Sequence, residues 1–111
     1  MTFSSYQQDG ISVVTLQGEI DGKTAPEAQQ YIAPLMASSH ALLLDMHGVA
    51  YMSSAGLRMM LLLYRQMASK DGKVALVGLS EEVEETMSAT GFLEFFVTAA
   101  DIDAGIAALG G

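Results

Sequence analysis

Apolar and polar residues near the start of the chain alternate in a way that predicts a β-hairpin. Thr2–Gln8 and Ile11–Glu19 are predicted as two strands, joined by the dipeptide Asp9-Gly10, which accepts the positive φ angles of a tight turn. The second strand carries apolar residues on both faces. That pattern is typical of a strand that is covered on both sides or placed centrally in a sheet.

A helix is predicted to follow over Ala25–Ala37. Thr24 has the character of its N-cap, and Glu27 three residues later completes the pattern of a capping box. Pro26 suits the first turn, whereas Pro34 predicts a kink or an early end.

The rest of the chain alternates strands with helices. Continuous apolar runs indicate buried parallel strands, and Ser80 is expected to cap the third helix, whose opening acids suit the positive end of the helix dipole. In chain order the predicted elements are a strand at Ala41–Asp45, a helix at Ser54–Ser69, a strand at Val74–Gly78, a helix from Ser80 to Gly91, a strand at Glu94–Val97 and a helix at Ala99–Leu109. This order predicts one α/β domain over residues 1–111, with a mostly parallel mixed sheet of about five strands, an antiparallel N-terminal hairpin and helices packed against the sheet.

Composition narrows the possible functions. Half of the residues are hydrophobic and 16% are charged, which is typical of a folded globular chain. The formal net charge of −8 argues against a nucleic-acid partner and against an anionic membrane surface. The first ten residues hold neither a basic segment nor a long apolar run, and no stretch is long enough to span a bilayer, so we expect a cytoplasmic location without membrane insertion.

Catalytic and metal-binding chemistry have little support in the sequence. There are no cysteines, and the two histidines, His40 and His47, are predicted as exposed loop residues without a clear acid partner. Asp45 and His47 are only two ligand types two residues apart, which is not a metal site. The glycine-rich phosphate loops are absent, and the glutamates that open the third helix are read as a solvated helix start. We therefore expect no cofactor, no metal and no enzymatic activity.

The segment after the second predicted parallel strand is the most informative part of the chain. Ser53 and Ser54 open a helix at the carboxyl edge of the sheet, where α/β proteins usually place their sites, although serines at a helix start also serve simply as caps. Gly56, in the first turn, is a poor helix former, which indicates that something approaches the backbone closely there.

The same helix is too apolar for one buried stripe. Leu57, Met60, Leu61, Tyr64 and Ala68 are expected to face the core, which leaves further apolar residues on or beside the opposite stripe. Two explanations stay open: these residues form an exposed partner surface, or another element of the same chain covers them. The residues concerned are Met59, Leu62 and Leu63.

Several segments together resemble the STAS domain of anti-sigma factor antagonists. The similar segments are Gly18-Glu19-Ile20-Asp21, Leu42-Leu43-Leu44-Asp45-Met46 with Gly48-Val49, Tyr51-Met52-Ser53-Ser54-Ala55-Gly56-Leu57, Gly72–Gly78 and Thr90-Gly91-Phe92. They follow the order of that family over nearly the whole chain. Each motif alone is modest, and together in this order they are specific.

The resemblance implies a regulatory binding protein. Members of the family bind an anti-sigma factor that is also a serine kinase of the histidine-kinase-like ATPase type. Phosphorylation releases them, and a serine phosphatase restores them. By position the phosphorylated serine is Ser54, with Ser53 as the second choice. Ser53 occupies the place where the family has an aspartate, and Ala55 occupies the family's second hydroxyl position.

The resemblance also implies a contact surface around this serine. Asp21 is expected to lie near the same edge, and the resemblance favours a partner contact there over the alternative of a turn residue that bonds its own backbone. The residues expected to contact the partner are Asp21, Met52, Ser53, Ser54, Gly56, Arg58, Met59 and Leu62. Two other functions stay open: a STAS subunit that binds a transporter or its ATPase without being phosphorylated, and a domain that binds a nucleotide or another small molecule at the same sheet edge.

Overall fold

The computed structural model describes residues 1–110 and contains a five-stranded mixed sheet in the order β1-β2-β3-β4-β5. β1 and β2 pair antiparallel, and the later neighbours pair parallel. The strands are β1 (Thr2–Gln8), β2 (Ile11–Gln17), β3 (Ala41–Gly48), β4 (Lys73–Val77) and β5 (Val97–Ala99). The helices are α1 (Ala25–Ala37), α2 (Ser54–Ala68), α3 (Glu81–Ala89), the 3-10 helix η1 (Phe92–Phe95) and α4 (Ile102–Ala108). The predicted fold class is thus confirmed.

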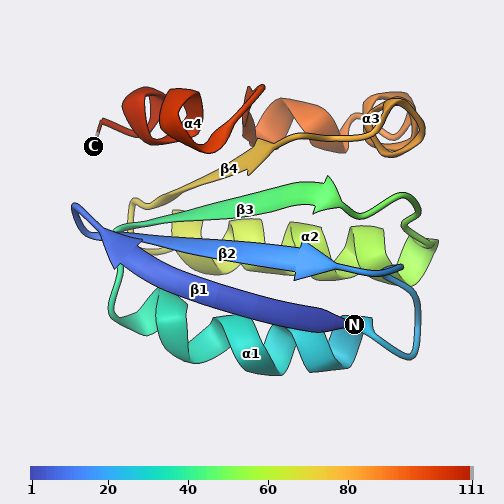
Figure 1. Cartoon of the computed structure of the whole chain (residues 1–111), viewed down its shortest axis with the longest axis horizontal. Coiled ribbons are helices and arrows are strands. Elements are labelled where there is room, and N and C mark those ends of the chain that lie inside the picture. The colour runs from blue at the N-terminus through green and yellow to red at the C-terminus, as the bar shows by residue number, and fades with distance from the viewer. Residues whose placement is uncertain (111) are drawn as a thin grey trace.

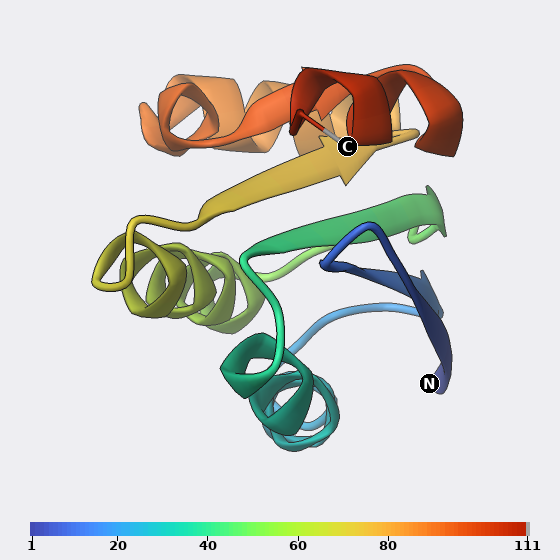
Figure 2. The same cartoon turned by 90° about the vertical axis from the view of Figure 1, so that its left-hand side faces the viewer.

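Helices cover the two faces of the sheet unequally (Figures 1 and 2). Helices α1 and α2 lie on one side of the sheet, and α4 lies on the other. Side chains of α1, α2 and α3 belong to the larger core, and those of α4 belong to the smaller core. β3 shows how the sequence serves both cores, because Leu42 and Leu44 belong to the larger one and Leu43 to the smaller one. This two-sided burial explains why the central strands read as continuous apolar runs.

The N-terminal hairpin matches its prediction. Asp9 and Gly10 have φ angles of 55° and 77°, so both central residues of the turn are left-handed, as a type I′ hairpin requires. α1 also has its predicted bounds, with Pro34 inside it. Pro34 therefore does not end the helix early.

The C-terminal part differs from its prediction. The expected strand at Glu94–Val97 is wrong for all but its last residue, because Phe92–Phe95 form η1 and the strand β5 starts only at Val97. Tyr64 of α2 stacks on Phe95 with ring centroids 5.0 Å apart, a tertiary contact that favours the turn over an extended segment. The last helix starts later than expected, because the Asp101 carboxylate accepts a hydrogen bond from the Ala104 N–H at 2.8 Å and caps it there.

Candidate functional site

The loops that follow β2 and β3 pair with each other at the carboxyl edge of the sheet. Ile20 and Met52 form a parallel bridge. The Ile20 N–H donates to the Tyr51 carbonyl at 3.1 Å, and the Ser53 N–H donates to the Ile20 carbonyl at 2.8 Å. This pairing brings the turn that carries Asp21 against the start of α2, two segments that lie far apart in the sequence.

The two serines at the start of α2 have different environments. Ser53 is the N-cap: its side-chain oxygen accepts from the Gly56 N–H at 3.4 Å, and the residue is half-buried. Ser54 is the first helical residue, and it is exposed. Within residues 1–110 its hydroxyl has no hydrogen-bond partner. Ser53 therefore holds the helix start, while Ser54 presents a hydroxyl to solvent.

Ser53 stands where the family that the sequence resembles has an aspartate. Serine and aspartate are both among the best N-cap residues, so a serine at this position can keep the cap. What changes is the charge, because the helix start then carries no carboxylate next to Ser54.

Gly56 is required by the docking of α2 on the loop after β2. A Cβ atom at this position would lie 2.5 Å from Met52 Cγ, 2.9 Å from Ile20 Cγ2 and 3.0 Å from the Ile20 carbonyl oxygen. Close approach to the backbone at Gly56 is thus confirmed, and the approaching group is the chain's own Ile20.

Asp21 caps the chain entry into α1, a role that the sequence reading gave to Thr24. Its Oδ1 accepts from the Lys23 N–H at 2.9 Å and the Thr24 N–H at 3.0 Å, while Thr24 Oγ1 accepts from the Asp21 N–H at 2.9 Å. Thr24 stands at the predicted N-cap position, but it has helical angles and its side chain makes no cap hydrogen bond to α1, so the predicted capping by Thr24 is wrong. The N–H groups of Thr24 and then Lys23 hold the pKa of the Asp21 carboxyl below its ordinary value of 3.8.

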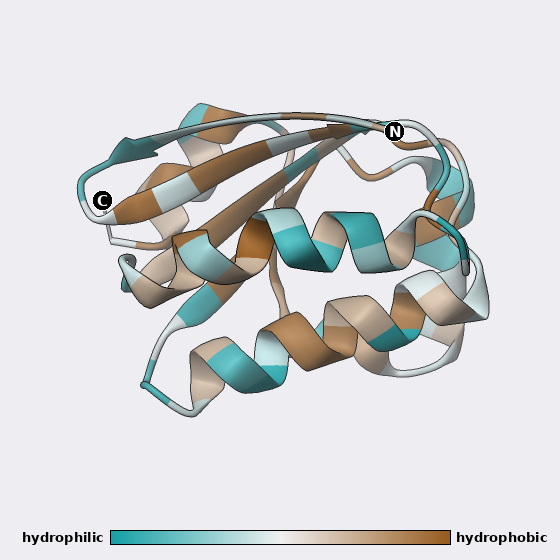
Figure 3. Cartoon of the chain, turned by 90° about the horizontal axis from the view of Figure 1, so that it is seen from below, coloured by the Kyte–Doolittle hydropathy of each residue, from teal (hydrophilic) through white to brown (hydrophobic). Residues whose placement is uncertain are grey.

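The residues expected to contact a partner around Ser54 differ in their exposure. Met52, Gly56 and Met59 are buried in the chain's own core, so little of their surface is accessible to a partner. Arg58 is exposed, and so is Leu62, with an exposed fraction of 39%. Gly56 lies against Met52 and Ile20, and α1 lies beside α2 and covers part of its apolar surface (Figure 3).

The predicted orientation of α2 was also partly wrong. Leu63 and Met67 are fully buried, whereas Leu61 and Tyr64 are half-buried and Ala68 is exposed. The buried stripe is rotated relative to the expected one because two elements, the sheet and α1, pack against this helix.

A shallow groove remains between α1 and α2, directly beside the start of α2. Its volume is about 230 Å³, and it is lined by Gly22, Ala25, Pro26, Gln29, Ala55, Arg58, Met59 and Leu62. The groove thus reaches Ala55, the residue that directly follows Ser54. It is mostly apolar, with one cation at its rim.

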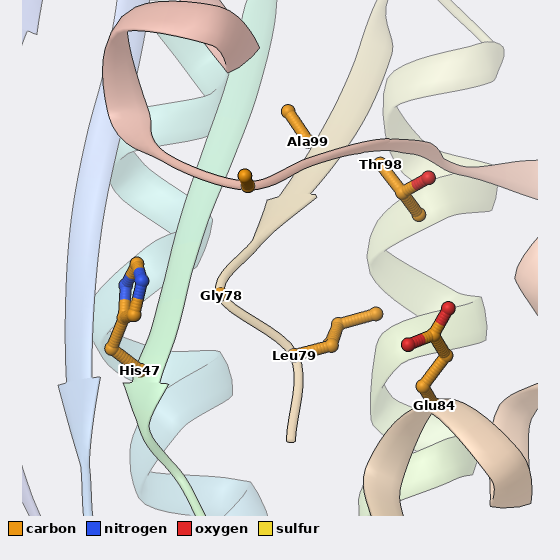
Figure 4. A pocket seen from close by; sticks show the side chains of 7 residues that line it. His47, Gly78, Leu79, Glu84, Thr98 and Ala99 are labelled. Atoms are coloured by element: carbon orange, nitrogen blue, oxygen red, sulfur yellow. The ribbon is translucent and has the colours of Figure 1, made fainter. Parts of the chain in front are cut away.

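A larger cavity of about 580 Å³ lies at the carboxyl ends of β3, β4 and β5. Figure 4 shows His47 and Glu84 on opposite sides of it, with Leu79 between them. His47 Nδ1 lies 2.6 Å from Asp45 Oδ1, a pairing that the sequence reading missed, although two strand residues two positions apart share a face of the sheet. No lysine or arginine lines this cavity in residues 1–110, so the phosphates of a nucleotide would find no cation there.

The histidines are both exposed, as predicted, although His47 lies inside β3 rather than after it. His40 contacts the hairpin turn instead, with Nε2 3.0 Å from the Asp9 carbonyl oxygen. In residues 1–110 no three ligand-type side chains gather as a metal would require. None of the helices in that part of the chain is both long and apolar enough to cross a membrane.

Comparison with known proteins identifies the family to which this fold belongs. The sequence model of the STAS domain matches residues 2–105. The chain belongs to the STAS domain family. BtrV of Bordetella bronchiseptica, whose name proposes it as an anti-sigma factor antagonist, is 32% identical over 101 residues, covering 90% of this chain and 87% of BtrV.

Solved STAS structures agree with the fold. An anti-sigma factor antagonist from Mycobacterium paratuberculosis superposes with a TM-score of 0.88 at 29% identity, covering 99% of this chain and 94% of that one. The Bacillus cell fate determinant SpoIIAA, in its phosphorylated form, superposes with a TM-score of 0.73 at 17% identity, covering 93% of this chain and 96% of SpoIIAA. This last likeness concerns the fold alone.

Proposed function

We propose that this STAS domain is an anti-sigma factor antagonist that binds its anti-sigma factor through the edge around Ser54 and is released when Ser54 is phosphorylated. The observation that carries the proposal is the exposed Ser54 hydroxyl, which makes no hydrogen bond within residues 1–110. It lies at an edge where two loops and the α1–α2 groove meet. The names of the relatives support the antagonist role.

The choice of Ser54 over Ser53 follows from their hydrogen bonds. Phosphorylating Ser53 would convert the oxygen that accepts from the Gly56 N–H into a bulky ester at a half-buried position. Phosphorylating Ser54 disturbs no hydrogen bond within residues 1–110. We therefore assign Ser54 as the phosphate acceptor: its oxygen takes the γ-phosphoryl group of ATP, and ADP and a proton leave.

The phosphate acts on the partner rather than on the fold. It adds about −1.5 to −2 charges at pH 7, and at a helix N-terminus the dipole stabilises an anion by about 0.3–1 kcal/mol. An anion buried without compensation under a partner costs several kcal/mol instead, and each ~1.4 kcal/mol is a tenfold loss of affinity. A rigid surface can therefore be switched by charge alone.

The remaining parts of the proposal concern the partners. The kinase is the anti-sigma factor itself, of the histidine-kinase-like ATPase type, and a serine phosphatase resets the switch. The protein works by binding, in the cytoplasm, without a cofactor of its own.

The test uses the purified chain with candidate anti-sigma kinases from the same genome. Intact-mass spectrometry after incubation with ATP and Mg²⁺ should show one added phosphate on the wild type and on Ser53→Ala, and none on Ser54→Ala. In titration calorimetry, Ser54→Ala should keep the affinity of the wild type and Ser54→Asp should weaken it at least tenfold. Equal affinities for the wild type and Ser54→Asp would contradict the proposal.

A further inference from the structure

Arg58 stands one helical turn after Ser54 on the same face of α2. Residues four apart on a helix are neighbours, with Cβ atoms about 5–6 Å apart, and their long side chains reach each other. Both residues are exposed. Within residues 1–110 the Arg58 guanidinium takes part in no ion pair or side-chain hydrogen bond.

Few acidic side chains near Arg58 would compete with a bound anion for its guanidinium. Arg58 lines the groove together with Gly22 and Ala55, so the turn between β2 and α1 packs against this part of α2. That turn carries two acids and one exposed lysine, Lys23. Glu19 is exposed and does not line the groove, and the Oδ1 of Asp21 is already bonded to its own backbone.

We propose that Arg58 binds the phosphate that Ser54 carries. The inference rests on the proposed function for the presence of this phosphate, but not on the identity of kinase or partner. The guanidinium is planar and always charged, and it can offer two parallel N–H donors to a phosphomonoester. The i,i+4 spacing supplies the reach, and the rigid first turns of α2 fix both attachment points.

The pairing gives phosphorylation a second effect. In the unmodified protein, Arg58 is the one lysine or arginine of residues 1–110 that lines the α1–α2 groove, and it is free to meet an acidic group of a partner. Once the phosphate holds Arg58, the edge gains negative charge and the groove loses its available cation in the same event. Release then combines repulsion at Ser54 with the withdrawal of Arg58.

The experiment installs phosphoserine at position 54 during translation, so that no kinase or partner is needed. ³¹P NMR titration then measures the second pKa of the phosphate, which is near 6 in an unpaired phosphoserine. Ion pairing with Arg58 favours the dianion, so Arg58→Gln should raise this pKa by about 0.15–0.4 on the pH scale. Arg58→Lys should restore part of the difference, because it keeps the charge but loses the paired donors.

Two control variants separate a specific contact from the loss of a positive charge. Arg65→Gln removes the same charge from the same helix, about 16 Å from Ser54 along its axis. Lys23→Gln removes another cation, in the packed turn. Both should leave the phosphate pKa as in the parent protein, and circular dichroism should show an unchanged fold for all variants.

The proposal is overturned if Arg58→Gln leaves the phosphate pKa unchanged, or if Lys23→Gln or Arg65→Gln shifts it as much. These outcomes are separate from the proposed function, because partner release by phosphorylation does not require the Arg58 contact. Conversely, evidence from this titration that Arg58 binds the phosphate would remain valid even if no kinase for Ser54 were found.

Discussion

Gly56→Ala tests how the start of α2 is held against the loop after β2. In an open helix this change is favourable by about 1 kcal/mol, because alanine is the better helix former. Here the added methyl would lie 2.5 Å from Met52 Cγ and 3.0 Å from the Ile20 carbonyl oxygen. The Met52 side chain can move, but the carbonyl belongs to the backbone and also accepts the Ser53 N–H at 2.8 Å.

The expected magnitude follows from these opposing effects. Overpacking a close-packed site costs about 1–3 kcal/mol, and weakening one backbone hydrogen bond adds about 0.5–1.5 kcal/mol. After the gain in helix propensity we expect a net loss of about 0.5–3.5 kcal/mol in the free energy of unfolding. At roughly 4 °C for each kcal/mol, the melting temperature should fall by about 2–14 °C.

Gly22→Ala is the matched control, because the same methyl group is added at the same edge. At Gly22 the nearest atom to this methyl group would be Ala55 Cβ at 4.0 Å, an ordinary van der Waals contact. We expect this variant to equal the wild type or to gain up to about 1 kcal/mol. Both are measured by thermal and urea unfolding, and a Gly56→Ala protein as stable as Gly22→Ala would refute the close docking of α2 on Ile20.

Further predictions concern the other residues of the edge. In urea unfolding, Ser53→Ala should cost about 1 kcal/mol, as loss of an N-cap does, while Ser54→Ala stays within about 0.5 kcal/mol of the wild type; equal losses would contradict the assignment of the cap. Because the folded pKa of Asp21 is lowered, the stability that its ionised form contributes is fully present above 3.8 and is lost as the pH falls through the folded pKa. The advantage of the wild type over Asp21→Asn should therefore be constant at neutral pH and shrink below about pH 4, as followed by unfolding at several pH values. Gly78→Ala should be destabilising, because Gly78 has a φ of 70° and the His47 ring occupies the place of its Cβ. Adding His47→Ala should recover part of that loss in a double-mutant cycle, and strictly additive losses would argue against the contact.

The parts of the fold that the sequence predicted best are governed by local rules. The Asp9-Gly10 turn and the bounds of α1 follow from turn and helix preferences over a few residues. The error at Glu94–Val97 has the opposite origin. Aromatic residues suit a strand, but Phe95 is placed by its stacking on Tyr64, a contact between segments about thirty residues apart in the sequence.

The entry into α1 shows a signal that was present in the sequence and was assigned to the wrong residues. Asp21 and Thr24 have the spacing of a capping box, as do Thr24 and Glu27. Both pairs lie before an apolar run, and local preference does not rank them. The structure favours the first pair because the Thr24 hydroxyl also donates to the Glu19 carbonyl at 2.7 Å, which ties the turn to the end of the preceding loop.

In the candidate site, too, some features follow from the local sequence and others depend on tertiary packing. That Ser53 and Ser54 stand at a helix start could be predicted from local sequence, and so could the meeting of this start with the turn of Asp21, because parallel strands end at one edge. Which apolar residues of α2 remain exposed could not, since that depends on where α1 packs. The excess of apolar residues had two explanations, and the structure favours burial in the chain's own core for Met59 and Leu63 while leaving Leu62 exposed. Under the proposed function, a partner at this edge would be recognised mainly by Leu62, Arg58 and the polar groups around Ser54. Charge would then weigh more in its affinity than apolar area does, and a single phosphate would be enough to change that affinity.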